Sequence, residues 1–166
     1  MPAFGRKSRT ILSTLCEDVQ DVLIVAIKFI DFALIDGARK ESRQNQAFTS
    51  DPPLSYARFG QSAHNWNCSC CSSISLPKAM ACDIVPYPVP PWNSKSPSAI
   101  AETERRFNEV ILVLSVTAEA IGVGLTFGKN FSLKDFPHIE VTDWAARKNS
   151  LITTDWTDIF QAGINF

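Results

Sequence analysis

The sequence predicts an α+β domain in which helices pack on a small antiparallel sheet. Helical patterns and short apolar runs occur in the order helix, strand, helix, loop, strand, helix, strand, strand. A chain of 166 residues, 45% of them hydrophobic and 20% charged, is long enough for one domain with one core. We therefore expect residues 1–166 to form a single domain.

The first half of the chain predicts two helices, a strand and a long loop. Apolar residues recur at helical spacing over residues 9–30, which indicates one amphipathic helix. Residues 32–35 form a short apolar run that ends at an Asp-Gly turn, as expected for a buried strand. Residues 39–48 are polar and favour a helix, whereas the proline, glycine and serine residues of 49–66 favour a loop.

The second half predicts three strands and a long helix. Residues 81–85 are a strand stopped by a run of prolines, which cannot donate to a β-ladder. The helix over residues 97–121 has a serine N-cap and ends at Gly122. Two further strands, 125–127 and 138–141, lie on either side of a polar loop.

Charge and hydropathy exclude two classes of partner. The formal net charge is −1, so nothing attracts the chain to nucleic acid or to anionic lipid. The apolar run of residues 22–34 is interrupted by charges and is too short to span a membrane. The basic N-terminus is followed too soon by acidic residues for a secretory signal peptide, so we expect synthesis in the cytoplasm.

Asp135 and His138 form the first candidate for chemistry. Pro137 fixes the backbone between them, so a carboxylate and an imidazole are held at close range. A zinc hydrolase needs this pairing, because imidazole binds the metal while a carboxylate takes a proton from the metal-bound water. The alternative is an ordinary loop that enters an edge strand.

Three further residues could belong to the same site. Asp83 interrupts an apolar strand, so a buried carboxylate there needs a partner or a metal; on an edge strand it would face water. His64 lies on the loop before that strand, where ligands often occur. Arg39 follows the Asp-Gly turn and could hold a substrate carboxylate or a developing oxyanion, unless it lies on a solvated helix face.

Four motifs resemble a known family. In order they are Gly37-Ala38-Arg39, Gly60-Gln61-Ser62-Ala63-His64-Asn65, Ala81-Cys82-Asp83-Ile84-Val85-Pro86-Tyr87-Pro88 and Lys134-Asp135-Phe136-Pro137-His138-Ile139-Glu140. The chain resembles the zinc peptidases of phage endolysins, which are L-alanyl-D-glutamate endopeptidases related to D-Ala-D-Ala carboxypeptidases and vancomycin-resistance dipeptidases. The resemblance covers about residues 4–144 and leaves 145–166 as a C-terminal tail. It implies the zinc D-Ala-D-Ala peptidase-like (hedgehog/DD-peptidase) fold.

The resemblance also implies a metal site. His64, Asp83 and His138 would be the three Zn²⁺ ligands, and the fourth position would hold water. Asp135 would be the general base that activates this water and then protonates the leaving amine. The reaction implied is metal-assisted hydrolysis of an amide bond.

Three other residues would support that reaction. By resemblance, Arg39 would bind or polarise the scissile carbonyl, and Ser62 would assist in binding substrate. Glu140 lies two residues after His138 and so on the same face of a strand, where it could hydrogen-bond to that ligand.

The chain departs from the family between His64 and Asp83, which lie further apart than usual. We interpret the Cys/Ser-rich residues 66–75 as a loop inserted beside the site. An alternative keeps the usual spacing and places Cys71 where the aspartate belongs, since a thiolate also binds zinc.

Two rival interpretations stay open. His64, Cys68 and Cys71, with Cys70 or Cys82, could close a structural zinc site, which would have no open position for hydrolysis. The chain could also be a non-catalytic member of the family that binds cell-wall peptide.

The function expected from the resemblance is lysis of bacteria. The chain would act as a monomer on the peptidoglycan stem peptide and cut the bond between L-Ala and D-Glu; D-Ala-D-Ala carboxypeptidase activity is the alternative. As a phage endolysin it would accumulate in the host bacterial cytoplasm until another protein opens the membrane. The peptide, rather than nucleic acid or a membrane, is the expected partner.

Overall fold

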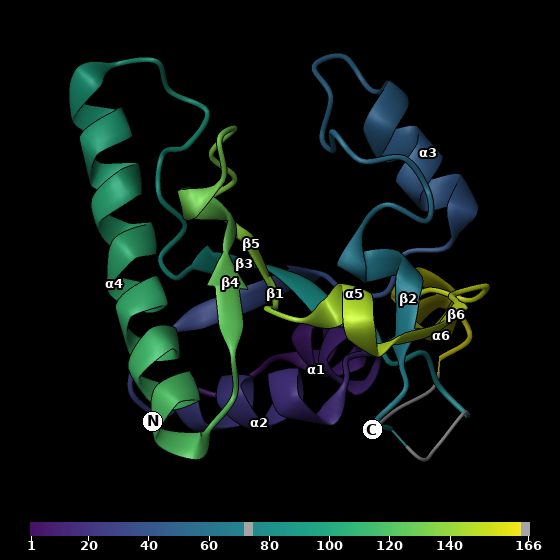
Figure 1. The fold of residues 1–166 in the computed structure, drawn as a ribbon. Helices are drawn as coiled ribbons and strands as arrows, with labels where there is room; N and C mark the ends of the chain where they lie inside the picture. The colour runs from purple at the N-terminus through teal and green to yellow at the C-terminus, as the bar shows by residue number, and fades with distance from the viewer. Residues whose placement is uncertain (72–74, 164–166) are drawn as a thin grey trace.

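A four-stranded antiparallel sheet is the centre of the fold (Figure 1). The computed structural model describes residues 1–71 and 75–163. The strand order is β1-β3-β5-β4, with β1 at Phe32–Asp36, β3 at Ala81–Pro86, β5 at His138–Val141 and β4 at Leu125–Phe127. All four predicted strands and the predicted α+β class are confirmed. Because β3 lies between β1 and β5, the edge-strand alternative for Asp83 is wrong.

Three helices cover the sheet and bury its apolar side chains. Helices α1 (Arg6–Ser13) and α2 (Glu17–Ala26) cross below the sheet, and α4 (Pro97–Ile121) stands at its side (Figure 1). Helix α1 packs against β1, and α4 packs against α2 and β3. The core formed there is typical of a sheet with one helical layer.

The prediction of one helix over residues 9–30 is wrong, because this part of the chain forms the two helices α1 and α2, and α2 ends at Ala26. Between them, Leu15 pairs with Ala79 in an isolated β-bridge. The N–H of Cys16 donates to the carbonyl of Ala79 at 2.8 Å, and the N–H of Ala79 donates to Thr14 at the same distance. These bonds draw the backbone out of the helix, while Leu15 stays buried and so preserves the apolar pattern.

The predicted bounds of α4 are confirmed. The Ser96 side chain accepts a hydrogen bond from the N–H of Ala99, and Pro97 occupies the first turn, where its missing N–H is not needed. Gly122 ends the helix with φ +76°, a left-handed conformation that favours glycine.

A smaller unit lies on the other side of the sheet. Strand β2 (Trp66–Cys68) pairs with β6 (Lys148–Leu151), so the segment interpreted as an inserted loop begins as a strand. Of the other residues of the predicted insertion, 69–71 and 75 lie outside helices and strands, and 72–74 lie outside the described residues. Strands β2 and β6 were not predicted from the sequence. Both are short, and β6 is exposed along its length, so neither shows an alternating apolar pattern.

The chain has further short helical elements. They are α3 (Glu41–Thr49), α5 (Trp144–Arg147), α6 (Trp156–Gln161) and the short 3-10 turns η1 (Ala63–Asn65) and η2 (Gly128–Asn130). Helix α3 confirms the helix predicted after the Asp-Gly turn. Within the described ranges, no helix is long and apolar enough to cross a membrane.

Candidate metal centre and active site

The sheet and one turn bring His64, Asp83 and His138 together. Asp83 of β3 and His138 of β5 are direct partners in the antiparallel register, so their side chains lie side by side. His64 enters from η1. Its Nε2 lies 3.3 Å from Asp83 Oδ1 and 3.3 Å from His138 Nδ1, and the last two atoms are also 3.3 Å apart.

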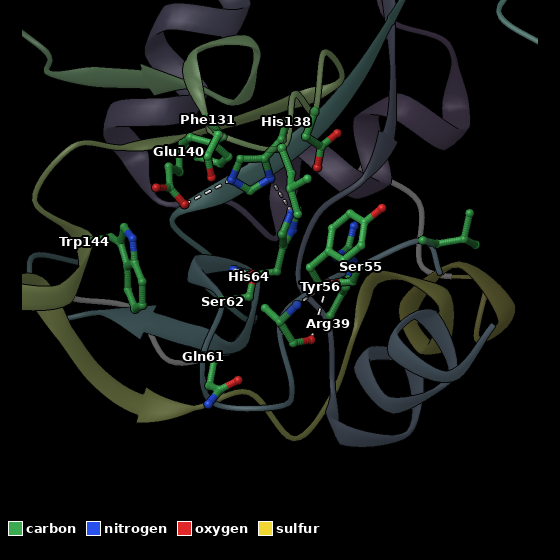
Figure 2. A pocket seen from close by; sticks show the side chains of 15 residues that line it. Arg39, Ser55, Tyr56, Gln61, Ser62, His64, Phe131, His138, Glu140 and Trp144 are labelled. Atoms are coloured by element: carbon green, nitrogen blue, oxygen red, sulfur yellow. Dashed lines mark hydrogen bonds and ion pairs between the residues drawn. The ribbon is translucent and has the colours of Figure 1, made fainter. Parts of the chain in front are cut away.

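In each histidine, the ring nitrogen that faces away from Asp83 has its own hydrogen-bond partner. That partner determines whether the nitrogen facing Asp83 carries a lone pair. His64 Nδ1 lies 2.6 Å from the carbonyl oxygen of Gly37, which can only accept, so Nδ1 carries the hydrogen and Nε2 carries a lone pair. His138 Nε2 lies 3.0 Å from Glu140 Oε2 (Figure 2), which in the neutral ring leaves the lone pair on Nδ1. Metal-binding histidines are commonly oriented in this way by a carbonyl or a carboxylate.

Two imidazole lone pairs and a carboxylate oxygen therefore converge. Three acceptors at such distances repel one another unless a cation lies between them. Two imidazoles and a carboxylate are a ligand set that zinc accepts, and each of these residues offers one ligand atom within 4.8 Å of the others. The residues therefore fit a metal ion.

Protonation of His138 and Asp83 follows from the same contacts. Burial lowers the pKa of His138, but hydrogen bonds to Asp83 and Glu140 outweigh it and raise the pKa to about 9. Burial raises the pKa of Asp83, but Arg39 and His64 reverse this and hold it well below its usual range. A proton and a metal ion thus compete for the same position, and metal binding releases the proton.

Asp135 lines the same cavity as His64 and His138. Burial, together with the negative charge of Asp83, raises the pKa of Asp135 above its ordinary value. A carboxylate perturbed in this direction is better matched to proton transfer near neutral pH. The Asp135 loop is tied to Gly128, whose carbonyl accepts from the N–H of Asp135 at 3.0 Å. Gly128 was not among the site residues predicted from the sequence.

Arg39 lies inside the site and is only 7% exposed, so the alternative of a solvated helix face is wrong. Its Nε donates to Asp36 at 2.7 Å, and its Nη2 forms an ion pair with Asp83. The backbone N–H of Arg39 donates to the carbonyl of His64 at 2.9 Å. Among the described residues, the two side-chain bonds, to Asp36 and Asp83, use two of the five guanidinium hydrogens, so three are left for a ligand.

Arg39 and the two histidines line a cavity of about 400 Å³, whose side chains are drawn in Figure 2. Its walls include the aromatic rings of Tyr56, Phe131 and Trp144, which the sequence analysis did not single out. A second cavity of about 890 Å³ shares Arg39, Asp135 and Tyr56 with the first, so the groove continues past the charged groups. Tyr56 and Phe131 lie outside the regular helices and strands, and Trp144 begins the four-residue helix α5, so no motif or long periodic segment marks them in the sequence.

Ser62 and Glu140 lie where the sequence placed them, near the histidines. Ser62 lines the cavity, and its Oγ accepts from the N–H of His64 at 3.3 Å, which stabilises the η1 turn. Glu140 contacts His138 and also lines the cavity.

The cysteines do not join this group. Asp83, not Cys71, lies beside His64, and among residues 1–71 and 75–163 the metal-compatible group containing His64 has no cysteine. Cys68, Cys70 and Cys71 gather separately, and Cys68 and Cys70 are joined as a disulfide. The structural site of His64 with Cys68 and Cys71 is therefore not formed.

Comparison with known proteins identifies a likeness in structure. No family model matches the chain, and no curated protein sequence matches it. The structure is similar to that of the L-Ala D-Glu endopeptidase ChiX of Serratia marcescens, with a TM-score of 0.54 and 18% sequence identity. The similarity covers 84% of this chain and 90% of that one. At this identity the likeness shows a shared fold.

Proposed function

We propose that the chain is a zinc-dependent peptidase that hydrolyses the peptide stem of bacterial peptidoglycan. The observation that carries the proposal is the convergence of His64, Asp83 and His138. Asp135 lines one cavity together with the two histidines. The shared fold with an L-Ala D-Glu endopeptidase supports the substrate class.

His64, Asp83 and His138 are the residues that would hold the metal. When bound, such an ion acts as a Lewis acid that polarises the scissile carbonyl and makes water a stronger nucleophile. Asp135 accepts a proton from the attacking water and passes it to the leaving amine. The free N–H groups of Arg39 donate to the carbonyl oxygen as it gains negative charge.

The shape of the groove favours cleavage inside a peptide. An endopeptidase must accommodate residues on both sides of the scissile bond, whereas a carboxypeptidase needs room for only one residue beyond it. Two adjoining cavities share Arg39 and Asp135, so chain can extend in two directions from the reactive groups. This supports the L-Ala–D-Glu bond over the terminal D-Ala-D-Ala bond.

The biological role that we propose is lysis of a bacterial host by a phage-type endolysin, acting on the cell wall after release from the host cytoplasm. The support is the resemblance carried by the four motifs. A peptidase with this specificity weakens the wall by removing its peptide cross-links.

Mass spectrometry of muropeptides tests the proposal. Purified cell wall is incubated with the zinc-loaded protein, and the expected products are fragments that end at L-Ala and peptides that begin at D-Glu. Release of D-Ala alone would instead indicate the carboxypeptidase. If the protein holds one zinc ion per chain and cuts no bond, the enzyme hypothesis is wrong.

A further inference from the structure

A chain of hydrogen bonds connects the C-terminal helix α6 to Arg39 through Asp36. The indole N–H of Trp156, the first residue of α6, donates to Asp36 Oδ1 at 2.6 Å. On its other oxygen, Asp36 accepts from Arg39 Nε at 2.7 Å. Arg39 in turn is paired with Asp83, one of the three residues that converge on the metal position.

The Asp36 carboxylate accepts four hydrogen bonds, which restrict its rotation. Its Oδ1 also accepts from the backbone N–H of Gly37 at 2.9 Å, and its Oδ2 also accepts from Arg43 Nη2 at 2.8 Å. Four donors occupy the roughly four lone-pair positions of a carboxylate. The Asp36 side chain is therefore held in one orientation, and it is 13% exposed.

Helix α6 is itself fixed to the domain. Asp155 caps it in a capping box with Asp158, and Asp158 forms an ion pair with Lys40. The ring of Trp156 lies 5.1 Å from the guanidinium of Arg43 and is buried. Helix α6 also packs against α1, so the donor that reaches Asp36 is on an anchored element.

We propose that Asp36 is a positioning residue for Arg39, and that Trp156 in turn fixes Asp36. The bond from Nε to Asp36 and the bond from Nη2 to Asp83 hold the planar guanidinium at two points, which prevents its rotation. Held in this way, Arg39 lines both cavities. The C-terminal segment, outside the resemblance, becomes part of the active site. What Arg39 does there rests on the proposed function.

A double-mutant cycle tests whether Asp36 acts through Arg39. Asp36→Asn is expected to lower kcat by about 10- to 100-fold with little change in KM, because misplacing a catalytic group by about 1 Å costs about that much. In an Arg39→Ala background the same substitution is expected to have no further effect. An equal loss in both backgrounds would show that Asp36 is merely structural and would overturn the proposal.

The substitution Trp156→Phe tests whether Trp156 fixes Asp36, and it has a matched control. It keeps a ring against Arg43 but removes the N–H, and we expect kcat to fall by about 3- to 10-fold. Trp66→Phe removes the same kind of bond, from the indole N–H to the carbonyl of Gly60 at 2.9 Å, and is expected to leave kcat unchanged. Equal effects of the two substitutions would contradict a specific role for Trp156.

Nitrogen-15 relaxation of the Arg39 Nε–H group provides a readout that does not depend on activity. Its order parameter is expected to fall in Asp36→Asn and in Trp156→Phe but not in Trp66→Phe. An unchanged order parameter in Asp36→Asn would overturn the inference, even if the wild type is an active peptidase. Conversely, an inactive wild type with an ordered Arg39 that loosens in both variants would overturn only the proposed function.

Discussion

The two histidines of the candidate site both face Asp83, and each is oriented by a hydrogen bond to a different kind of group. His64 is oriented by a backbone carbonyl, that of Gly37, and His138 is oriented by Glu140. Both arrangements turn a ring nitrogen lone pair toward Asp83. The sequence motifs predicted that these residues belong together, but only the β3–β5 register explains why Asp83 and His138 are adjacent.

Asp135→Asn tests the role of the general base. An amide cannot accept the proton of the attacking water, so we expect kcat to fall by about 10²- to 10⁴-fold while zinc content stays at the wild-type level. Asp21→Asn, at an exposed position of α2, is the matched control and should leave kcat unchanged. Retention of more than a tenth of the activity in Asp135→Asn would assign the proton transfer to another group.

The metal ligands are tested by zinc content. Replacing His138 by alanine removes one of the three proposed metal ligands. The purified variant should therefore lose most of its bound zinc and all measurable activity. Cys71→Ser is expected to keep both, since Cys71 lies in a separate group. Loss of zinc from Cys71→Ser but not from Asp83→Ala would restore the alternative ligand assignment.

Glu140 is expected to strengthen metal binding through His138. Glu140→Ala removes the acceptor for Nε2, and such a loss weakens metal affinity by about 10- to 100-fold. Competition with a chelator of known affinity measures the change, with the exposed Glu119→Ala on α4 as the control. Equal affinities of the two variants would show that the Glu140 contact does not orient the ligand.

Helix bounds can be predicted from the sequence where local chemical signals mark them. The bounds of α4 were predictable because Ser96 and Gly122 mark its ends chemically. The break between α1 and α2 was not, because it is caused by backbone bonds between Cys16 and Ala79, far apart in the chain. Periodicity reports which side chains are buried, and burial continues through the break.

The loop that carries Asp135 depends on a glycine. A Cβ at Gly128 would lie 2.9 Å from the Cβ of His138 and closer still to the carbonyl oxygen of Asp135, so the backbone would have to shift. We expect Gly128→Ala to destabilise the fold by about 1–3 kcal/mol and to lower kcat. Thermal unfolding and kinetics measure the two effects.

The control for that variant is Gly5→Ala, because a Cβ at Gly5 meets nothing within 4 Å. It should change neither stability nor kcat by more than a small amount. If Gly128→Ala behaves in the same way, close packing of the Asp135 loop is not required for the reaction.

At the scale of the whole molecule, the site is assembled from segments spread over most of the chain. The turn after β1 supplies Arg39, η1 supplies His64, and the β3–β5 pair supplies Asp83 and His138. The contribution of α6 could not be predicted, because Trp156 has no motif around it and its bond to Asp36 spans 120 residues. A supporting residue close in sequence, such as Glu140 beside His138, can be predicted, whereas Trp156 is found only through its tertiary contact with Asp36.

Titration of the metal-depleted protein with zinc is the most direct test of the central claim, that one metal held by His64, Asp83 and His138 supports hydrolysis of the stem peptide. Activity on purified peptidoglycan is measured at each addition. We expect no activity without metal, a linear rise, and a plateau at one zinc ion per chain. Full activity in the metal-depleted protein, or none at any zinc level, would contradict the account.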